Sequence, residues 1–271
     1  METRAPALVV DDLTLRLGPR VLFEHLSMAV SAGEFVALLG PNGAGKTSLI
    51  QVLLGVLDPT NGTVRIDGRP PRRGRADVGY VPQRRTFEPG TPLRGRDLVR
   101  LGLDGHRWGP GWPPAARAAV DAAVRDVEAD RFADQPLGSL SGGEQQRLRV
   151  AQALVSNPHL LLCDEPLTSL DIGSQRTVVE LLDGFRRRTH SAVVVVTHDL
   201  NVVLPFVDRV LYLVGGRWAI GSADEIVTTE VLSRLYGTPV DVLRVRDRLI
   251  VVGPPDEPHP HGEAGETAEE D

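Results

Sequence analysis

The sequence has a single cysteine, Cys163, and no long hydrophobic run. One cysteine excludes an intrachain disulfide and is typical of a reducing compartment. The apolar runs are short, such as residues 192–196, whereas a helix that spans a bilayer needs about 18 apolar residues. We expect neither a membrane span nor a secretory signal, because the apolar run before Asp11 covers only residues 7–10, which is shorter than the apolar region of a signal peptide.

Lysine is as scarce as cysteine. Of the 30 basic residues, 29 are arginine and one is Lys46. Arginine presents a broad planar fork of donors, whereas lysine carries a compact point charge. We therefore expect Lys46 to lie where a compact ammonium group is required.

The formal net charge is −6, and the excess of acid lies at the C-terminus. Residues 253–271 contain seven acids and no lysine or arginine, which leaves 29 acidic against 30 basic residues in the rest of the chain. A nearly neutral body argues against a dedicated nucleic-acid binder. Residues 253–271 are expected to be a disordered acidic tail, and the same composition favours a solvated segment over a metal sensor for His259 and His261.

Short apolar runs alternate with helical patterns, which predicts an α/β fold around a parallel sheet. Continuous apolar runs are typical of strands covered on both faces, and they occur at residues 35–39, 160–163 and 192–196. Helices are predicted at residues 46–54, 113–130 and 173–188 and after Ser141. Further strands are expected at residues 13–17, 21–30, 63–66 and 78–81, and a hairpin at 209–214 and 217–221. Residues 88–112, rich in Gly, Pro and Arg, interrupt this pattern and suggest an inserted subdomain.

Residues 40–47 match the phosphate-binding pattern G-x-x-x-x-G-K-[ST], between a predicted strand and a predicted helix. In such a loop, backbone amides and the helix N-terminus bind phosphate oxygens. Lys46 is expected to contact the β- and γ-phosphates, and the Thr47 hydroxyl to bind Mg²⁺. The expected nucleotide-binding residues are Gly40, Pro41, Asn42, Gly43, Ala44, Gly45, Lys46, Thr47 and Ser48.

Two carboxylates, Asp164 and Glu165, directly follow the apolar run 160–163. Ligands of open parallel sheets bind at the carboxyl ends of the strands. Asp164 is therefore expected to hold Mg²⁺, and Glu165 to take a proton from, or orient, an attacking water. The alternative is a pair of solvated acids at a strand end, which the phosphate-binding loop makes less favourable. Cys163 is interpreted as a small buried hydrophobe without chemistry.

A second helix start has the features of an anion site. Ser141 and Glu144 form the S-x-x-E pattern of a capping box, which is a sufficient structural explanation by itself. The same helix start, with Gly142 and Gly143, also offers backbone amides to an anion. The two interpretations are compatible, and one chain would then hold two phosphate-binding helix ends.

With these motifs the chain resembles the ATP-binding subunits of ATP-binding-cassette (ABC) transporters. Residues 140–147 resemble the family's LSGGQ signature, with Glu144 where the strict pattern has Gln. Gln83 resembles the Q-loop glutamine, residues 169–171 resemble the D-loop, and His198 resembles the switch histidine at the end of a buried strand. The order and spacing of the motifs agree from about residue 8 to residue 236.

The resemblance implies a P-loop NTPase core with an N-terminal antiparallel β subdomain and an inserted α-helical subdomain, roughly residues 88–155, within an ATPase domain of residues 1–252. It implies ATP and Mg²⁺ as cofactors. It also implies a head-to-tail dimer, in which the signature of one chain caps the γ-phosphate held by the other. The implied catalytic residues are Glu165, His198 and Gln83. The implied signature-side contacts are Ser141, Gly142, Gly143, Glu144 and Asp171, and the implied metal ligands are Thr47, Gln83 and Asp164.

The resemblance further implies an ATPase that drives transport through separate integral-membrane permease subunits, at the cytoplasmic face of the cell membrane, with an extracytoplasmic substrate-binding protein in the same system. Residues 80–85 and 231–242 resemble importers of zinc or manganese, and ferric-siderophore importers are similar. Cassette proteins that act on ribosomes or DNA are the alternative class. They usually carry two cassettes or a long coiled-coil or basic insertion, which this chain lacks, so no nucleic acid is expected as a partner.

One position departs from the family pattern. The family usually stacks an aromatic residue on adenine from the strand before the P-loop, and that position holds Leu17 here. Adenine is therefore expected to pack on aliphatic carbon, or on Phe23 or another ring recruited from elsewhere.

Overall fold

The computed structural model describes residues 6–83, 87–88, 90–104, 113–246 and 248–253. The predicted acidic tail lies outside these residues apart from Gly253, so the expectations for His259 and His261 lie outside them too. Within the described ranges, no helix combines the length and the hydropathy that crossing a membrane requires.

The core is a mixed sheet that has six strands in the described part of the chain, in the order β5-β6-β7-β3-β8-β9. The neighbours from β5 to β8 pair in parallel, and β9 pairs with β8 antiparallel at the edge. The strands are β3 (Phe35–Leu39), β5 (Val78–Val81), β6 (Leu160–Asp164), β7 (Ala192–Val196), β8 (Arg209–Val214) and β9 (Arg217–Gly221). The predicted α/β fold with a parallel core is thereby confirmed.

Both faces of this sheet are covered, which explains the continuous apolar runs. In β3, Phe35 and Leu39 point into one buried cluster, and Val36 and Leu38 point into the other. Helix α5 (Ile172–Thr189) covers the first face, and α1 (Lys46–Leu53) covers the second.

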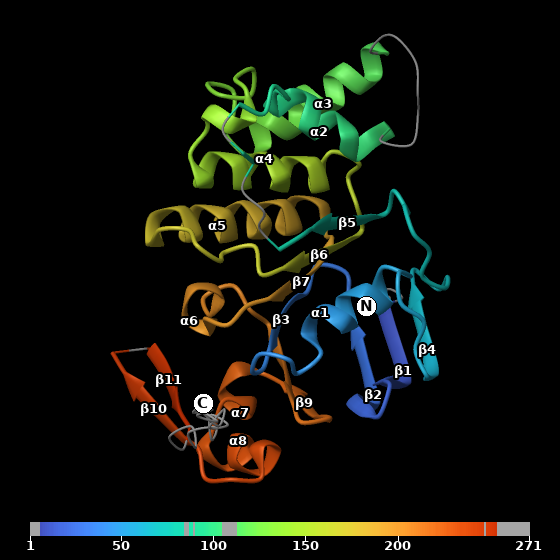
Figure 1. Ribbon diagram of the computed structural model, residues 1–271, viewed down its shortest axis with the longest axis vertical. Helices are drawn as coiled ribbons and strands as arrows, with labels where there is room; N and C mark the ends of the chain where they lie inside the picture. The colour runs from blue at the N-terminus through green and yellow to red at the C-terminus, as the bar shows by residue number, and fades with distance from the viewer. Residues whose placement is uncertain (1–5, 84–86, 89, 105–112, 247, 254–271) are drawn as a thin grey trace, which may run out of the picture.

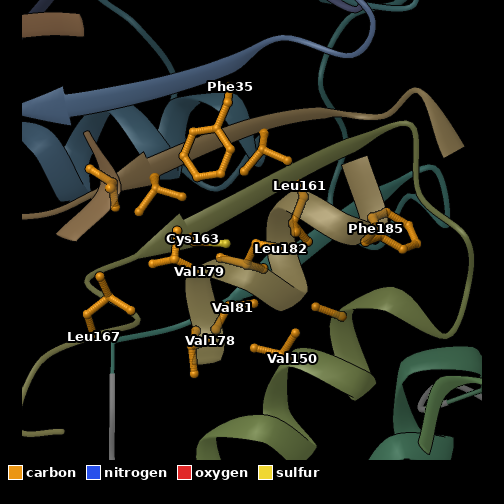
Figure 2. Packing of buried hydrophobic residues seen from close by; sticks show 14 of the residues in the cluster. Phe35, Val81, Val150, Leu161, Cys163, Leu167, Val178, Val179, Leu182 and Phe185 are labelled. Carbon is orange, nitrogen blue, oxygen red and sulfur yellow. The ribbon is translucent and has the colours of Figure 1, made fainter. Parts of the chain in front are cut away.

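The packing of α5 on β6 shows what surrounds the lone cysteine. Leu182 and Phe185 of α5 lie near Leu161 and Cys163 of β6 (Figure 2). Cys163 is completely buried, and burial raises the pKa of its thiol far above the usual range. A thiol that stays protonated in a hydrocarbon environment acts as a small hydrophobe, as the sequence indicated.

A second, antiparallel sheet of three described strands packs beside α1 (Figure 1). It contains β1 (Leu8–Leu17), β2 (Arg20–Val30) and β4 (Asn61–Ile66), with β1 in the middle. Leu17 pairs with Arg20 at the turn between β1 and β2. This is the expected N-terminal β subdomain.

Helices form a separate layer at the top of Figure 1. They are α2 (Gly95–Asp104), α3 (Pro114–Asp126) and α4 (Gly142–Leu154), with a 3₁₀ turn, η1 (Leu137–Ser139), before α4. Sequence reasoning did not predict α2, because glycines made this stretch look irregular. Those glycines allow close helix packing: a Cβ at Gly102 would lie 2.1 Å from the Gln152 carbonyl oxygen of α4.

The C-terminal part contains short helices and a hairpin that lies apart from the main sheet (Figure 1). Its elements are α6 (Leu200–Val203), α7 (Ala223–Ile226), α8 (Thr229–Tyr236), β10 (Asp241–Val245) and β11 (Arg248–Val252). Sequence reasoning missed the β10–β11 hairpin, because apolar residues occur on both of its faces and blur the alternation.

Candidate functional site

The loop between β3 and α1 has the backbone of a phosphate-binding loop. Gly40, Gly43 and Gly45 all have positive φ, at 144°, 76° and 98°. A Cβ at Gly40 would lie 2.1 Å from the Leu213 carbonyl oxygen, so this position excludes every other residue type. Left-handed residues in a short loop before a helix are typical of concave nests of amides, which bind anions.

Lys46, the lone lysine, is folded into this loop and is 6% exposed. Its Nζ donates hydrogen bonds to the carbonyl oxygens of Gly40 (2.7 Å) and Pro41 (2.9 Å). Burial lowers the pKa of Lys46, and the negative charges of Glu165 and Asp164 oppose that shift. A compact ammonium group donates to both carbonyls at once, which agrees with the expectation that this position requires a lysine.

Thr47 and Asp164 meet where β6 ends. The Thr47 hydroxyl donates to Asp164 Oδ1 at 3.3 Å, and Asp164 is 2% exposed. Burial raises the pKa of Asp164, and the hydrogen bond from Thr47 opposes the shift. A divalent cation would relieve this burial cost, and hydroxyl and carboxylate oxygens are the ligands that Mg²⁺ prefers. Thr47 and Asp164 fit an ion that takes its other oxygen ligands from phosphates and water. Among the described residues, no group of three or more His, Cys, Asp or Glu is placed to hold a metal ion.

Glu165 is held in an uncommon conformation beside Asp164. Its φ is +47°, and its backbone N–H donates to the Val196 carbonyl at 3.1 Å. Its Oε2 accepts hydrogen bonds from Gln83 Nε2 and Thr168 Oγ1, each at 3.1 Å. The structure therefore brings together Gln83 and Glu165, which lie 82 residues apart. Sequence reasoning missed Thr168, whose signal is its position three residues after the carboxylate.

His198 reaches the P-loop from another side. It follows β7, and its neighbour Thr197 donates its backbone N–H to the Leu38 carbonyl of β3 at 3.2 Å. The ring is exposed, and within the described part of the chain it makes no hydrogen bond or ion pair. His198 lines a hollow of about 450 Å³ together with Gly40, Pro41 and Asn42. Its backbone is thus fixed while its ring remains available to a ligand.

The second predicted anion site lies elsewhere. Ser141 caps α4, and its Oγ and backbone N–H donate to Glu144 Oε2 at 2.7 and 2.8 Å. The capping box is confirmed. Residues 141–144 line neither hollow beside the P-loop, and α4 belongs to the helical layer of Figure 1 rather than to the layer of α1.

Asp171 lies beside this helix start. It caps α5 by accepting the Ser174 N–H (3.0 Å) and Ser174 Oγ (2.6 Å), and these hydrogen bonds lower the pKa of Asp171. A Cβ at Gly143 would lie 2.7 Å from Ser174 Oγ, so the starts of α4 and α5 are adjacent. The candidate residues thus form two separate groups, a partly buried one around the P-loop and an exposed one around Ser141 and Asp171.

A hollow of about 330 Å³ beside the P-loop contains the position expected to face adenine. Leu17, 47% exposed, lines it together with Arg20 and Ser48. Phe23 is completely buried behind Gly45, so the expectation that its ring could be recruited is not supported. Arg20 was missed by sequence reasoning. Its Nη2 donates to the Gly43 carbonyl at 2.7 Å, which ties the β1–β2 turn to the P-loop.

Known proteins resemble this chain in sequence and in structure. The model of the family described as "ABC transporter" matches residues 23–168. The zinc transport system ATP-binding protein TroB of Treponema pallidum is 36% identical over 236 residues, which cover 86% of this chain and 88% of the relative. The hemin import ATP-binding protein HmuV of Rhodopseudomonas palustris is 37% identical over 235 residues, covering 82% and 84%.

Among solved structures, a dimeric post-hydrolysis ATP-binding cassette bound to ADP and Pi matches with a TM-score of 0.66 and 29% identity. The match covers 78% of this chain and 97% of that one. Zinc and hemin relatives are similar to this chain to the same degree, so the comparisons distinguish no substrate between them.

The hollow at Leu17 predicts how the chain binds the base. Stacking on an aromatic ring is worth about 1–3 kcal/mol per base, and leucine offers no π face. Leu17→Tyr should tighten ATP and GTP binding by at least about fivefold, the factor for ~1 kcal/mol, with little change in maximal rate. Nucleotide titrations of both proteins test this. Leu243→Tyr, at a similarly exposed leucine of β10, is the matched control. Unchanged affinities in Leu17→Tyr would remove Leu17 from the base site.

Proposed function

Because the chain belongs to the ABC transporter family as one of its ATP-hydrolysing subunits, we propose that it powers the import of a divalent metal cation, such as zinc or manganese, through a separate membrane permease. The observation that carries the ATP-hydrolysing part of the proposal is the gathering of Lys46, Asp164, Glu165 and His198 around one loop. The zinc relative supports the substrate class. An extracytoplasmic binding protein would deliver the cation, and this subunit would act at the cytoplasmic face of the cell membrane.

The P-loop and the residues beside it would bind the phosphates and the Mg²⁺ ion of ATP. Backbone amides of residues 40–47 and the Lys46 ammonium would bind the β- and γ-phosphates. When bound, Mg²⁺ neutralises charge on these phosphates, and the Thr47 hydroxyl and Asp164 would hold it. The oxygen of the Gln83 amide is available to the same ion, because the hydrogen bond to Glu165 uses the nitrogen.

Glu165 is placed to act as the base. Gln83 and Thr168 both donate to Oε2, which fixes the direction of the carboxylate. Its other oxygen would take the proton of the attacking water as the water adds to the γ-phosphorus and ADP leaves. His198, whose ring is free, would contact the γ-phosphate from the opposite side.

The exposed group around Ser141 and Asp171 would complete the site of a second copy. It includes two capped helix starts, which lie side by side and outside the chain's own P-loop hollows. A head-to-tail dimer would place this group against the γ-phosphate of the partner, in agreement with the dimeric cassette that the chain resembles. The two separate anion sites then have one explanation.

The permease would dock between the sheet and the helical layer. A hollow of about 480 Å³ lies there, lined by Tyr80, Pro82, Leu101 and Gln152. Leu101 is a half-exposed apolar residue of α2. Pro82 directly precedes Gln83, so a movement of the permease at this hollow would reach the partner of Glu165.

The first test concerns the base. Glu165→Gln should reduce ATP hydrolysis by at least about 100-fold, because general base catalysis contributes roughly 10²–10⁴-fold and an amide cannot take up the proton. ATP binding should persist, and the variant should accumulate as an ATP-bound dimer in size-exclusion chromatography. Glu230→Gln, at an exposed glutamate paired with Arg234, is the control. ATP hydrolysis by Glu165→Gln at the wild-type rate would show that Glu165 is not the general base.

The second test concerns the shared site. Ser141→Arg should abolish hydrolysis although its P-loop is intact, because the added bulk blocks the partner's γ-phosphate. Lys46→Ala should also be inactive, through weaker phosphate binding. A mixture of the two should regain activity, since each heterodimer has one intact composite site. Ser222→Arg removes an equivalent capping box from α7 and should keep full activity. Full activity of Ser141→Arg would contradict the dimer.

The third test concerns the substrate. The chain, purified with its permease and reconstituted in vesicles, should drive ATP-dependent uptake of Zn²⁺ or Mn²⁺. Haemin and a ferric siderophore are measured in parallel, because a haemin importer is an equally similar relative. The Glu165→Gln complex gives the background. Uptake of haemin or siderophore without metal uptake would assign the chain to those importers instead.

A further inference from the structure

The C-terminal hairpin β10–β11 has one face against the protein and one face exposed. Val242 and Leu249 contact the core cluster. The opposite face carries Leu243, Val245 and Ile250, which are 51%, 50% and 44% exposed. Figure 1 shows the hairpin on the same side of the molecule as α6, the short helix that follows His198. The proposed function assigns no role to the residues of this hairpin.

Asn201 of α6 joins the hairpin by a two-way hydrogen bond. Its side-chain Nδ2 donates to the Leu249 carbonyl at 3.0 Å, and its Oδ1 accepts the Leu249 backbone N–H at 2.8 Å. The side-chain amide therefore satisfies both backbone groups of one residue, as a neighbouring strand would. The Leu249 side chain is 8% exposed, so these groups would be costly to leave unpaired.

Asn201 is also hydrogen-bonded within its own segment, which includes His198. We call this segment, residues 197–201, the switch loop. Asp199 Oδ1 accepts the Asn201 backbone N–H at 2.9 Å, and the Asp199 backbone N–H donates to Thr197 Oγ1 at 3.1 Å. His198 lies between these two anchored residues. A continuous series of hydrogen bonds thus runs from Leu249 to the backbone on both sides of His198.

Helix α6 is too short to hold the switch loop by itself. It has four residues, Leu200–Val203, and isolated helices of such length are unstable in water. The hollow beside His198 is bounded by Leu249 and Val251 of β11 and by Pro41 of the P-loop. The hairpin is therefore the outer support of the segment that presents His198 to the P-loop.

We propose that Asn201 is a positioning residue for His198: by tying Leu249 of β11 to the switch loop, it holds the segment that presents the His198 ring to the P-loop. The inference rests on the proposed function, which places the His198 ring at the γ-phosphate. It adds that the geometry of this ring depends on a hairpin about 50 residues further along the chain. A displacement of about 1 Å, transmitted from a distant residue, can cost on the order of 100-fold in rate.

The test uses Asn201→Leu in the full chain, since leucine is similar in size but cannot bond to Leu249. The kcat of ATP hydrolysis should fall by at least about tenfold, while KM and the affinity for MgATP stay within about twofold. Amide hydrogen exchange of residues 197–204 should accelerate. Asn201→Asp keeps the acceptor for the Leu249 N–H and loses the donor, so its loss of kcat should be smaller. Leu243→Ser, on the exposed face of the hairpin, should keep the wild-type kcat.

A double-mutant cycle separates this inference from the proposed function. In a His198→Ala background, Asn201→Leu should cause no further loss of kcat, because the ring that it positions is gone. Wild-type kcat in the folded Asn201→Leu and Asn201→Asp variants would overturn this inference and leave the proposed function intact.

Additive losses of kcat in the cycle would also overturn the inference, since Asn201 would then act on stability rather than on His198. Wild-type kcat in His198→Ala would instead remove the role given to His198 by the proposed function. If Asn201→Leu fails to fold, the Asn201→Asp variant decides, with the same readouts.

Discussion

The hydrogen-bonded register of β6, β7 and β3 is the constraint on which the site depends. In the strand register, Asp164 of β6 pairs with Val196 of β7, and Val196 pairs with Leu38 of β3. The ladder continues past the strand ends, through the Glu165 N–H to Val196 and the Thr197 N–H to Leu38. A slip of one residue would turn Asp164 to the other face of the sheet and away from Thr47. The parallel pairing of three buried strands therefore brings the carboxylates, the switch loop and the P-loop to a common edge.

The charged groups at this edge of the sheet are buried. Lys46 and Asp164 are almost inaccessible, and burial shifts the pKa of each toward its neutral form. Hydrogen bonds from Lys46 to two carbonyls and from Thr47 to Asp164 offset part of that cost. Fixed charges of this kind are suited to bind a phosphate group without rearrangement of the protein. The group around Ser141 is different, because its helix caps are exposed and their hydrogen bonds are made locally.

Glycines allow close backbone packing in two regions of this chain, but a sequence motif marks only one of them. In the P-loop, Gly40 allows the backbone to pass against the Leu213 carbonyl, and the surrounding motif makes its role evident. In α2, Gly95 and Gly102 allow close packing on the neighbouring segments and on α4, but no motif marks them. The local sequence therefore predicted the turn between β3 and α1 and concealed the helix α2. The same limit applies to β10–β11, whose apolar residues do not alternate clearly between faces.

The sequence by itself determined the sheet core, the phosphate-binding loop and the residue types of the site. Buried strands such as β7 are continuous apolar runs, and Lys46 stands out as the one lysine. These features depend on residues adjacent in the chain, so local pattern contains them. Tertiary structure decided the contact of Gln83 with Glu165, the complete burial of Phe23 and the hydrogen bonds between Asn201 and Leu249. Each of these depends on how segments far apart in the sequence pack together. Burial and hydrogen bonding across the whole fold set that packing, so the local hydrophobic pattern does not predict it.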